Sequence, residues 1–148
     1  MNLFHSLQIS ASGLQSQRTV ITVISENMAN AHTTRTEEGG PYLRKRAVLT
    51  PAPVPSDSPF SELLTRRMGP EAMGVKVLEV VQDPEGLKTI FDPSHPDADE
   101  TGLVLLPNVN LMEEMVALLA ASRVFEANVA AFNAAKTMTV KALEIGNR

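Results

Sequence analysis

The sequence predicts a mainly α-helical fold with a small β insert. Two long terminal helices would form a coiled-coil-like antiparallel pair or bundle around a proline-rich middle that carries a β-hairpin. The first observation is the distribution of proline, because all ten prolines of the 148-residue chain lie between Pro41 and Pro107. Since proline breaks a helix interior, the proline-free arms can form long helices. The chain therefore divides into residues 1–32, 33–107 and 108–148, and we expect only the middle to fold by itself.

The second observation is the spacing of apolar residues in the C-terminal arm, which predicts an amphipathic helix over residues 111–145. Asn110 followed by Glu113 fits an Asn-led variant of the capping box at its start. Gly146 follows the last apolar residue as a C-terminal stop. The predicted assembly seam on this helix comprises Leu111, Met115, Leu118, Phe125, Val129, Phe132 and Leu143.

The N-terminal arm repeats this pattern, and Asn2 is a plausible N-cap for a helix that ends at about residue 29 or 30. Gly13 inside this helix costs about 1 kcal/mol relative to alanine. Either a partner helix approaches closely at Gly13 or the cost is simply tolerated, and we take tolerance as the default. The predicted seam residues of this arm are Leu7, Leu14, Ile21, Ile24 and Met28.

Apolar residues at strict intervals of seven imply a partner along the helix. On pattern alone, an ordinary antiparallel helix pair within one small bundle is the favoured arrangement. However, two long helices with a short β insert cannot enclose a full core, so the seam side chains would stay partly exposed in a monomer. Each large apolar side chain contributes about 1.5–3 kcal/mol when it is buried. The pattern therefore predicts an assembling protein rather than a free enzyme.

The middle of the chain predicts loops and short strands. Residues 33–41 read as a loop, residues 42–50 as a strand, and the prolines between 51 and 59 as a linker. Residues 75–81 and 87–91 are strand-like and flank the sequence Asp83-Pro-Glu-Gly86, which suits a type I turn. We therefore expect a hairpin that pairs these two segments, with a further short strand at 103–106.

Composition excludes several classes of protein. The chain has no cysteine, so no disulfide or zinc–thiolate site can form. The net charge is −4, and the only basic cluster is Arg44, Lys45 and Arg46, which we place on the solvent face of a strand rather than on nucleic acid. The longest strictly apolar run, residues 115–121, falls short of the ~20 residues of a membrane span. The N-terminus also lacks the features of a conventional signal peptide.

One segment resembles a metal site. His95, Asp97, Asp99 and Glu100 are ligand types, and Asp97, Asp99, Thr101 and Gly102 match the first half of a calcium loop. The twelfth position of such a loop requires a bidentate glutamate, but Asn108 stands there. We therefore favour a solvated acidic turn. No phosphate-binding, nucleophile-elbow or zinc-protease motif occurs, so we expect neither a cofactor nor catalysis.

Longer segments resemble a known family. Residues 10–14 (SASGL) and 24–31 (ISENMANA) are similar to the N-terminal signature of bacterial flagellar rod and hook axial proteins. Four further segments resemble the proximal-rod members of that family. They are residues 33–42 (TTRTEEGGPY), 92–103 (DPSHPDADETGL), 107–110 (PNVN) and 121–128 (ASRVFEAN). The motif residues, which are also interface candidates, are Asn27, Asn30, Pro93, His95, Pro96, Asp97, Asp99, Pro107, Asn108, Arg123 and Asn128.

The chain departs from the family pattern in two places. Thr34, Arg35 and Thr36 replace the Thr-Pro-Gly-Tyr turn of hook and distal-rod relatives, as in the shorter rod type. Phe125 stands where the family often has tyrosine, which removes a hydroxyl group but keeps the ring.

The resemblance implies a structural subunit of the flagellar proximal rod. Its terminal helices would pack with other copies and other rod proteins, and the rod would transmit motor torque to the distal rod and hook, as motility requires. The chain would pass through the flagellar type III export apparatus without a cleaved signal and reside in the periplasm next to basal-body ring and rod-base components. Nucleic acid and direct membrane insertion are not expected. The loop over residues 92–110 is a candidate subunit contact.

Two alternatives belong to other classes. A soluble helical adaptor or chaperone that binds one partner helix would form a discrete oligomer that melts cooperatively in isolation. A metal-dependent hydrolase would use His95, Asp97 and Asp99 and would bind divalent metal in calorimetry. The rod interpretation instead predicts terminal arms that gain helix only on assembly. Circular dichroism of the full chain against a fragment of residues 34–107 separates the adaptor from the rod subunit.

We predict that Phe132→Asp or Leu14→Asp abolishes incorporation and motility but leaves the β element folded. A charge cannot be buried unpaired in an apolar seam. Swimming assays combined with circular dichroism of the purified variants test this. Normal swimming in either variant would contradict the seam assignment.

Overall fold

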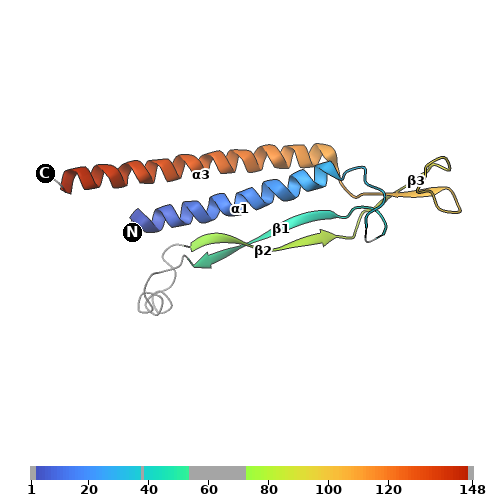
Figure 1. Cartoon of the computed structure of the whole chain (residues 1–148), viewed down its shortest axis with the longest axis horizontal. Helices are drawn as coiled ribbons and strands as arrows, with labels where there is room; N and C mark the ends of the chain where they lie inside the picture. Colours follow the sequence, from blue (N-terminus) through green and yellow to red (C-terminus); the bar gives the residue numbers. More distant parts are fainter. Residues whose placement is uncertain (1–2, 38, 54–72, 147–148) are drawn as a thin grey trace. The chain divides into compact units, whose positions relative to one another are not determined.

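The computed structural model describes residues 3–37, 39–53 and 73–146. Its two long helices are α1 (Leu3–Ala29) and α3 (Leu111–Gly146), and four strands lie between them in sequence (Figure 1). These strands are β1 (Arg44–Pro53), β2 (Met73–Asp83), β3 (Lys88–Phe91) and β4 (Leu103–Leu106). Two long helices packed together with small antiparallel hairpins confirm the predicted fold class. The proposed cap Asn2 and the prolines of residues 54–72 lie outside the described residues.

The strand pairing differs from the prediction. β2 pairs with β1, and β3 pairs with β4, so the expected hairpin between residues 75–81 and 87–91 is wrong. The expected strand at 103–106 is confirmed, and it aligns Lys88 with Leu106 and Phe91 with Leu103. The expected strand near residues 42–50 extends to Pro53, which we had assigned to a linker.

The Asp83–Gly86 segment connects β2 to β3, which lie in different sheets. The chain bends there, with the Glu85 N–H donating to Asp83 Oδ1 at 3.1 Å and Gly86 at a φ of +80°. Asn108 Nδ2 donates to the carbonyl oxygens of Asp83 at 2.8 Å and Glu85 at 2.6 Å. The segment is therefore bound to a part of the chain that is distant in sequence.

The chain forms two compact units, of which the first comprises residues 1–19, 49–78 and 122–148. In this unit α1 meets α3 at Gly13, where an added Cβ would lie 3.3 Å from the side-chain nitrogen and oxygen of Asn128. Our default for Gly13, a tolerated cost, is therefore wrong, since a helix does approach closely there. Two serines also join α1 to β2. Ser16 Oγ donates to the Val75 carbonyl at 3.0 Å, and the Val75 N–H donates to Ser12 Oγ at 3.1 Å.

The second unit comprises residues 20–48 and 79–121. It contains the end of α1, the start of β1, the β3–β4 hairpin and the start of α3. Most of the described residues that are fully buried lie in this unit. Its buried apolar side chains are Val23, Ile24, Tyr42, Val104, Val109 and Ala121.

The helix α3 begins at Leu111, the residue at which the sequence predicts its start. The Met112 N–H donates to Asn110 Oδ1 at 3.1 Å, which confirms Asn110 as the N-cap. Asn110 Nδ2 donates to Glu113 Oε1 at 2.9 Å, so Glu113 binds the side chain of Asn110 and not its backbone N–H as in a capping box. At the other end the helix includes Gly146, one residue beyond the predicted end at 145.

The buried side of α3 has a different register from the predicted seam. Its least exposed side chains repeat at alternating intervals of four and three residues. They are Glu114, Leu118, Ala121, Phe125, Asn128, Phe132, Ala135 and Thr139. The column of Leu118, Phe125 and Phe132 is shared with the predicted seam. The second column consists of small or polar residues, which allow close approach.

The β3–β4 connection is a compact turn built on Asp99 and Gly102. The Asp92 N–H donates to the Gly102 carbonyl at 2.9 Å. Gly102 has a φ of +78°, and a Cβ there would lie only 3.0 Å from Phe91 Cε2 and from Pro93 Cγ. Glycine is therefore required both by the backbone conformation and by space.

We predict that this turn loosens at acid pH. Asp99 Oδ1 accepts the Thr101 hydroxyl at 2.7 Å and the Leu103 and Thr101 N–H groups at 2.9 Å each. These hydrogen bonds, the Thr101 hydroxyl first, hold the pKa of Asp99 below its ordinary value of 3.8. Because the folded pKa is depressed, the stabilisation is present above about pH 4 and is lost as the pH falls through the folded pKa.

The measurement is the amide proton shift of Leu103 by NMR between about pH 6 and pH 2. It should titrate in the native chain and stay flat in Asp99→Asn, whose amide oxygen still accepts but does not ionise at these pH values. A flat response in the native chain would contradict the assignment.

Candidate functional site

A buried polar cluster joins α1, β1 and α3 within the second unit. Asn27 is its centre, with only 1% of its surface exposed. Its Nδ2 donates to the Lys45 carbonyl at 2.8 Å and to Glu114 Oε2 at 3.2 Å. Its Oδ1 accepts the Tyr42 hydroxyl at 3.0 Å and the Lys45 N–H at 2.9 Å. All four hydrogen-bonding positions of the amide are therefore occupied.

Glu114 is the charged member of this cluster, and it is likewise 1% exposed. Arg44 Nε donates to Glu114 Oε1 at 2.7 Å, so each carboxylate oxygen has a partner. A buried charge is tolerated only when it is paired and hydrogen-bonded in this way. The cluster can therefore position elements of the fold, but it offers no free group for catalysis.

We expected all three basic residues of β1 on the solvent face of the strand, but the structure places only one of them there. Arg44 and Lys45 are half-buried, and Lys45 Nζ lies 3.2 Å from Glu26 Oε2 and 5.6 Å from the centre of the Tyr42 ring. Arg46 alone is exposed. Burial of Tyr42, followed by the negative charges of Glu26 and Glu114, raises the pKa of its hydroxyl. Tyr42 therefore remains a neutral hydrogen-bond donor at physiological pH.

Asn108 connects this cluster to the loops. Its Oδ1 accepts the Arg44 N–H at 2.8 Å, while its Nδ2 binds the Asp83–Gly86 turn. The structure thus places two residues of the family motif, Asn27 and Asn108, in contacts inside the subunit. A third, Asn128, lies against Gly13 in the other unit.

The acidic loop uses its side chains for local structure. Asp97 Oδ2 accepts the Thr34 hydroxyl at 2.7 Å, its N–H donates to His95 Nδ1 at 3.1 Å, and Arg35 Nη1 lies 3.9 Å from Asp97 Oδ1. Among residues 3–37, 39–53 and 73–146, no group of three or more His, Asp or Glu side chains could hold a metal ion.

The remaining motif residues occupy varied environments. Asn30 Nδ2 donates to the Glu26 carbonyl at 2.9 Å and its Oδ1 accepts the Thr33 hydroxyl at 3.1 Å. Arg123 forms an exposed ion pair with Glu126 at 3.0 Å. Pro107 is buried, whereas Pro93 and Pro96 are exposed.

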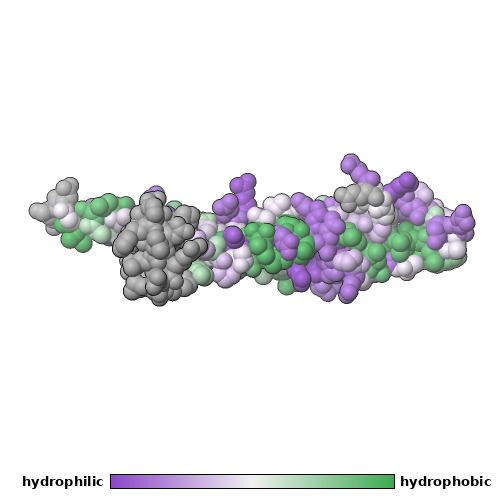
Figure 2. Space-filling view, turned by 90° about the horizontal axis from the view of Figure 1, so that it is seen from below, coloured by the Kyte–Doolittle hydropathy of each residue, from purple (hydrophilic) through white to green (hydrophobic). Residues whose placement is uncertain are grey.

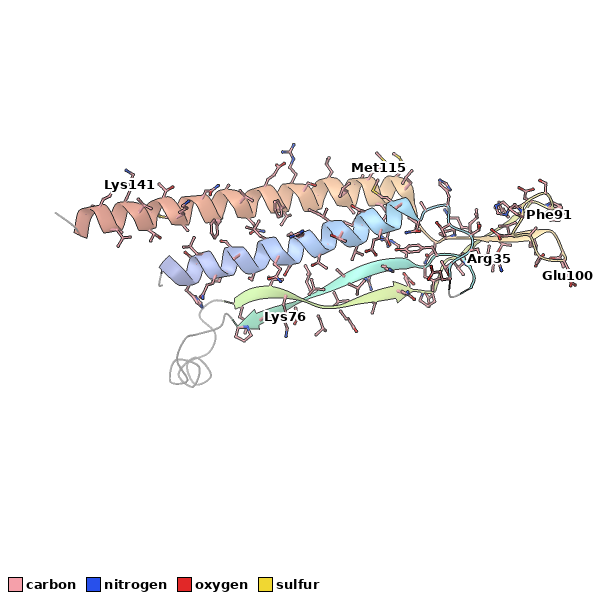
Figure 3. All side chains as sticks on the ribbon, viewed as in Figure 1. Arg35, Lys76, Phe91, Glu100, Met115 and Lys141 are labelled. Atoms are coloured by element: carbon pink, nitrogen blue, oxygen red, sulfur yellow. The ribbon has the colours of Figure 1, made fainter. Side chains whose placement is uncertain are left out.

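The predicted seam residues are buried to different degrees inside the subunit. Ile24 is buried, and those that are half-buried are Leu7, Leu14, Ile21, Met28, Leu118, Phe125 and Phe132. Four on α3 are exposed, namely Leu111, Met115, Val129 and Leu143. Figure 3 shows Met115 on the first turns of α3. Whether these residues contact other subunits stays a prediction.

Much of the surface of α3 is apolar. Met112, Val116 and Leu119 are each about two-thirds exposed. By length and composition alone, α3 could cross a membrane. A single such helix is weak evidence for a membrane span, because core helices and signal sequences satisfy the same criterion.

Sequence reasoning missed the partners that surround Asn27. Tyr42, Arg44 and Glu114 are separated from it by 15 to 87 positions in the chain, so local spacing could not connect them. One signal was available, since Glu114 falls four residues before Leu118 on the helical stripe. A charged residue at a core position is a sign of a buried pair.

The fold and the cluster indicate a structural protein, because a buried polar cluster joins two long helices and much of the surface of α3 is apolar. Residues 101–145 match the family model described as flagellar basal body rod FlgEFG protein C-terminal. Over about 98–99% of both chains, this chain is 42% identical to the flagellar basal-body rod proteins FlgC of Borreliella burgdorferi and of Bacillus subtilis. It is 32% identical to FlgC of Salmonella typhimurium over 99% of both chains.

The chain belongs to the FlgC family of flagellar basal-body rod proteins. It is therefore a structural component of the flagellar rod rather than an enzyme.

We predict that Asn27→Ala destabilises the subunit by about 3 kcal/mol or more. The substitution leaves several buried polar groups without a partner, at about 1–3 kcal/mol each. Asn30→Ala is the matched control, because Asn30 lies one turn later and its hydrogen bonds are less buried. It should cost at most about 1 kcal/mol. Urea unfolding followed by circular dichroism measures both. Equal losses of stability would show that the cluster does not stabilise the subunit.

Proposed function

We propose that this chain is a subunit of the proximal rod, in which its terminal helices pack against those of neighbouring subunits and transmit motor torque to the distal rod and hook. The observation that carries this proposal is the exposed apolar surface of α3. A single soluble subunit gains nothing from exposing Met112, Val116 and Leu119. Neighbouring subunits that cover them would contribute about 1.5–3 kcal/mol for each large side chain buried.

The buried side of α3 supports the same proposal. The least exposed side of the helix includes Ala121, Asn128 and Ala135, and Asn128 lies beside Gly13 of α1. The side that carries Met115 and Leu119 is left for other contacts. Stiff, long helices with two contact sides suit a shaft under torsion, because each helix is held between its own subunit and a neighbour.

The fully buried side chains point to an order of assembly. Among the described residues they concentrate in the second unit, around the polar cluster, whereas the first unit contains few. We propose that the parts of α1 and α3 in the first unit become rigid only when neighbouring subunits cover them. The division into two assembly helices, residues 1–32 and 108–148, around a middle of residues 33–107 remains part of this proposal.

The partners follow from the rod assignment. We propose that the chain contacts copies of itself, other rod proteins and basal-body ring or rod-base components, with the loop over residues 92–110 as one contact. We further propose passage through the flagellar type III export apparatus without a cleaved signal and residence in the periplasm. Subunit contacts, rather than direct membrane insertion, account for the apolar surface, because α3 also exposes Arg123, Glu126, Lys136 and Lys141.

A soluble adaptor or chaperone is the alternative of another class. It would also have an exposed helix surface, but cells that lack it would still build rods from other subunits. Electron microscopy of basal bodies from a deletion strain distinguishes the two. The proposed function requires that the rod is absent.

We predict that Leu119→Asp abolishes swimming without unfolding the subunit. Leu119 is 68% exposed, so a charge costs little in the free chain but would be buried unpaired under a neighbour. Leu119→Met keeps an apolar side chain at the same position and should swim normally. The assay is complementation of a deletion strain on soft agar, with urea unfolding of the purified variants. Normal swimming of Leu119→Asp would contradict the proposal.

A further inference from the structure

One face of the β3–β4 hairpin is apolar and uncovered. The strand register pairs Thr89 with Leu105 and Phe91 with Leu103, so these four side chains share a face. Phe91 is 72% exposed, and Leu103 and Leu105 are also exposed. The opposite face carries Val104, which is fully buried. Figure 2 shows hydrophobic residues at the hairpin bordered by hydrophilic ones.

Phe91 lies beside the turn although it is exposed. A Cβ on Gly102 would lie 3.0 Å from Phe91 Cε2 and from Pro93 Cγ, so the edge of the ring is close to the Gly102 backbone. An exposed aromatic side chain is typical of a central residue in an interface.

The loop that joins the two strands of this hairpin is acidic. It carries Asp92, Asp97, Asp99 and Glu100, of which Asp97 lies 3.9 Å from Arg35 Nη1. Asp92 and Asp99 hold the turn beside Phe91, and Glu100 projects from it without a hydrogen bond or ion pair to any described residue (Figure 3). A partner for this face therefore needs apolar side chains and a positive charge.

The end of α3 offers that combination. Met138, Lys141 and Ile145 follow one another at intervals of three and four residues, so they form one stripe of the helix. Met138 and Ile145 are more than half exposed, and Lys141 points away from α1 without a partner among the described residues (Figure 3).

We propose that the apolar face of the hairpin (Thr89, Phe91, Leu103 and Leu105) docks on the α3 stripe (Met138, Lys141 and Ile145) of a second copy, with Glu100 facing Lys141. The inference rests on the proposed function and gives it a specific contact. The two surfaces differ, so the contact is heterologous and repeats without closing into a dimer. Such a contact suits an axial assembly.

The chain contains no cysteine, so single-cysteine variants make a clean test. Thr89→Cys and Met138→Cys are purified as full chains, mixed, and treated with a short bismaleimide cross-linker. The expected product is a cross-linked dimer in the mixture and little dimer from either variant alone. Ile90→Cys mixed with Met138→Cys is the matched control, because Ile90 lies on the other face of the same strand.

Charge reversal tests the polar part of the contact. Glu100→Lys and Lys141→Glu, each introduced into the appropriate cysteine partner, should lower the yield of dimer several-fold. Together they should restore it, because the pair is then reversed rather than broken. A Phe91→Ser change in the Thr89→Cys chain should lower the yield about tenfold or more.

The inference is overturned if the mixture gives no more dimer than the Ile90 control, or if Thr89→Cys cross-links to itself. It is also overturned if the charge reversals do not compensate. A chain that complements motility but gives any of these results would refute this contact and leave the rod function intact. Failure of the wild-type chain to complement would instead refute the proposed function.

Discussion

The hydrogen bonds of Asn27 are the constraint on which the second unit depends. One amide side chain binds both backbone groups of Lys45 in β1, the hydroxyl of Tyr42 and the carboxylate of Glu114 in α3. Heptad patterns specify which sides of two helices meet, but they allow sliding by whole turns. A buried polar group that is satisfied at only one position removes this freedom. Asn27 therefore fixes how far α1 and α3 are shifted relative to each other in this unit.

The same helix also covers backbone groups of the β1–β2 sheet. Asn27 pairs with β1 at Lys45, and Ser12 and Ser16 pair with β2 at Val75. A two-stranded sheet has two unpaired edges, which bind other chains unless they are covered. Because α1 side chains bind the backbone groups of Lys45 and Val75, these groups are not available to another chain.

The helices were predictable from sequence because their signals are local. The Asn110–Glu113 cap and the apolar repeat fixed α3 almost to the residue, and the fold class followed from the absence of proline in both arms. The strand pairing was not predictable, because β1 and β2 are far apart in the sequence and no local signal pairs them. Only half of the buried side of α3 was predictable. Its second column contains Ala121, Asn128 and Ala135, which are not large apolar residues and so do not belong to the predicted seam. Motif resemblance singled out Asn27 and Asn108, but only the structure shows what they bind.

The central claim is that parts of α1 and α3 in the first unit become rigid only when neighbouring subunits cover them. Hydrogen exchange of the free chain, compared with the same chain in isolated rods, tests it most directly. The account predicts slow exchange around Asn27 and Glu114 in both states, because the polar cluster is internal. It predicts fast exchange over residues 134–146 in the free chain and strong protection in rods. Equal protection of residues 134–146 in the two states would contradict it.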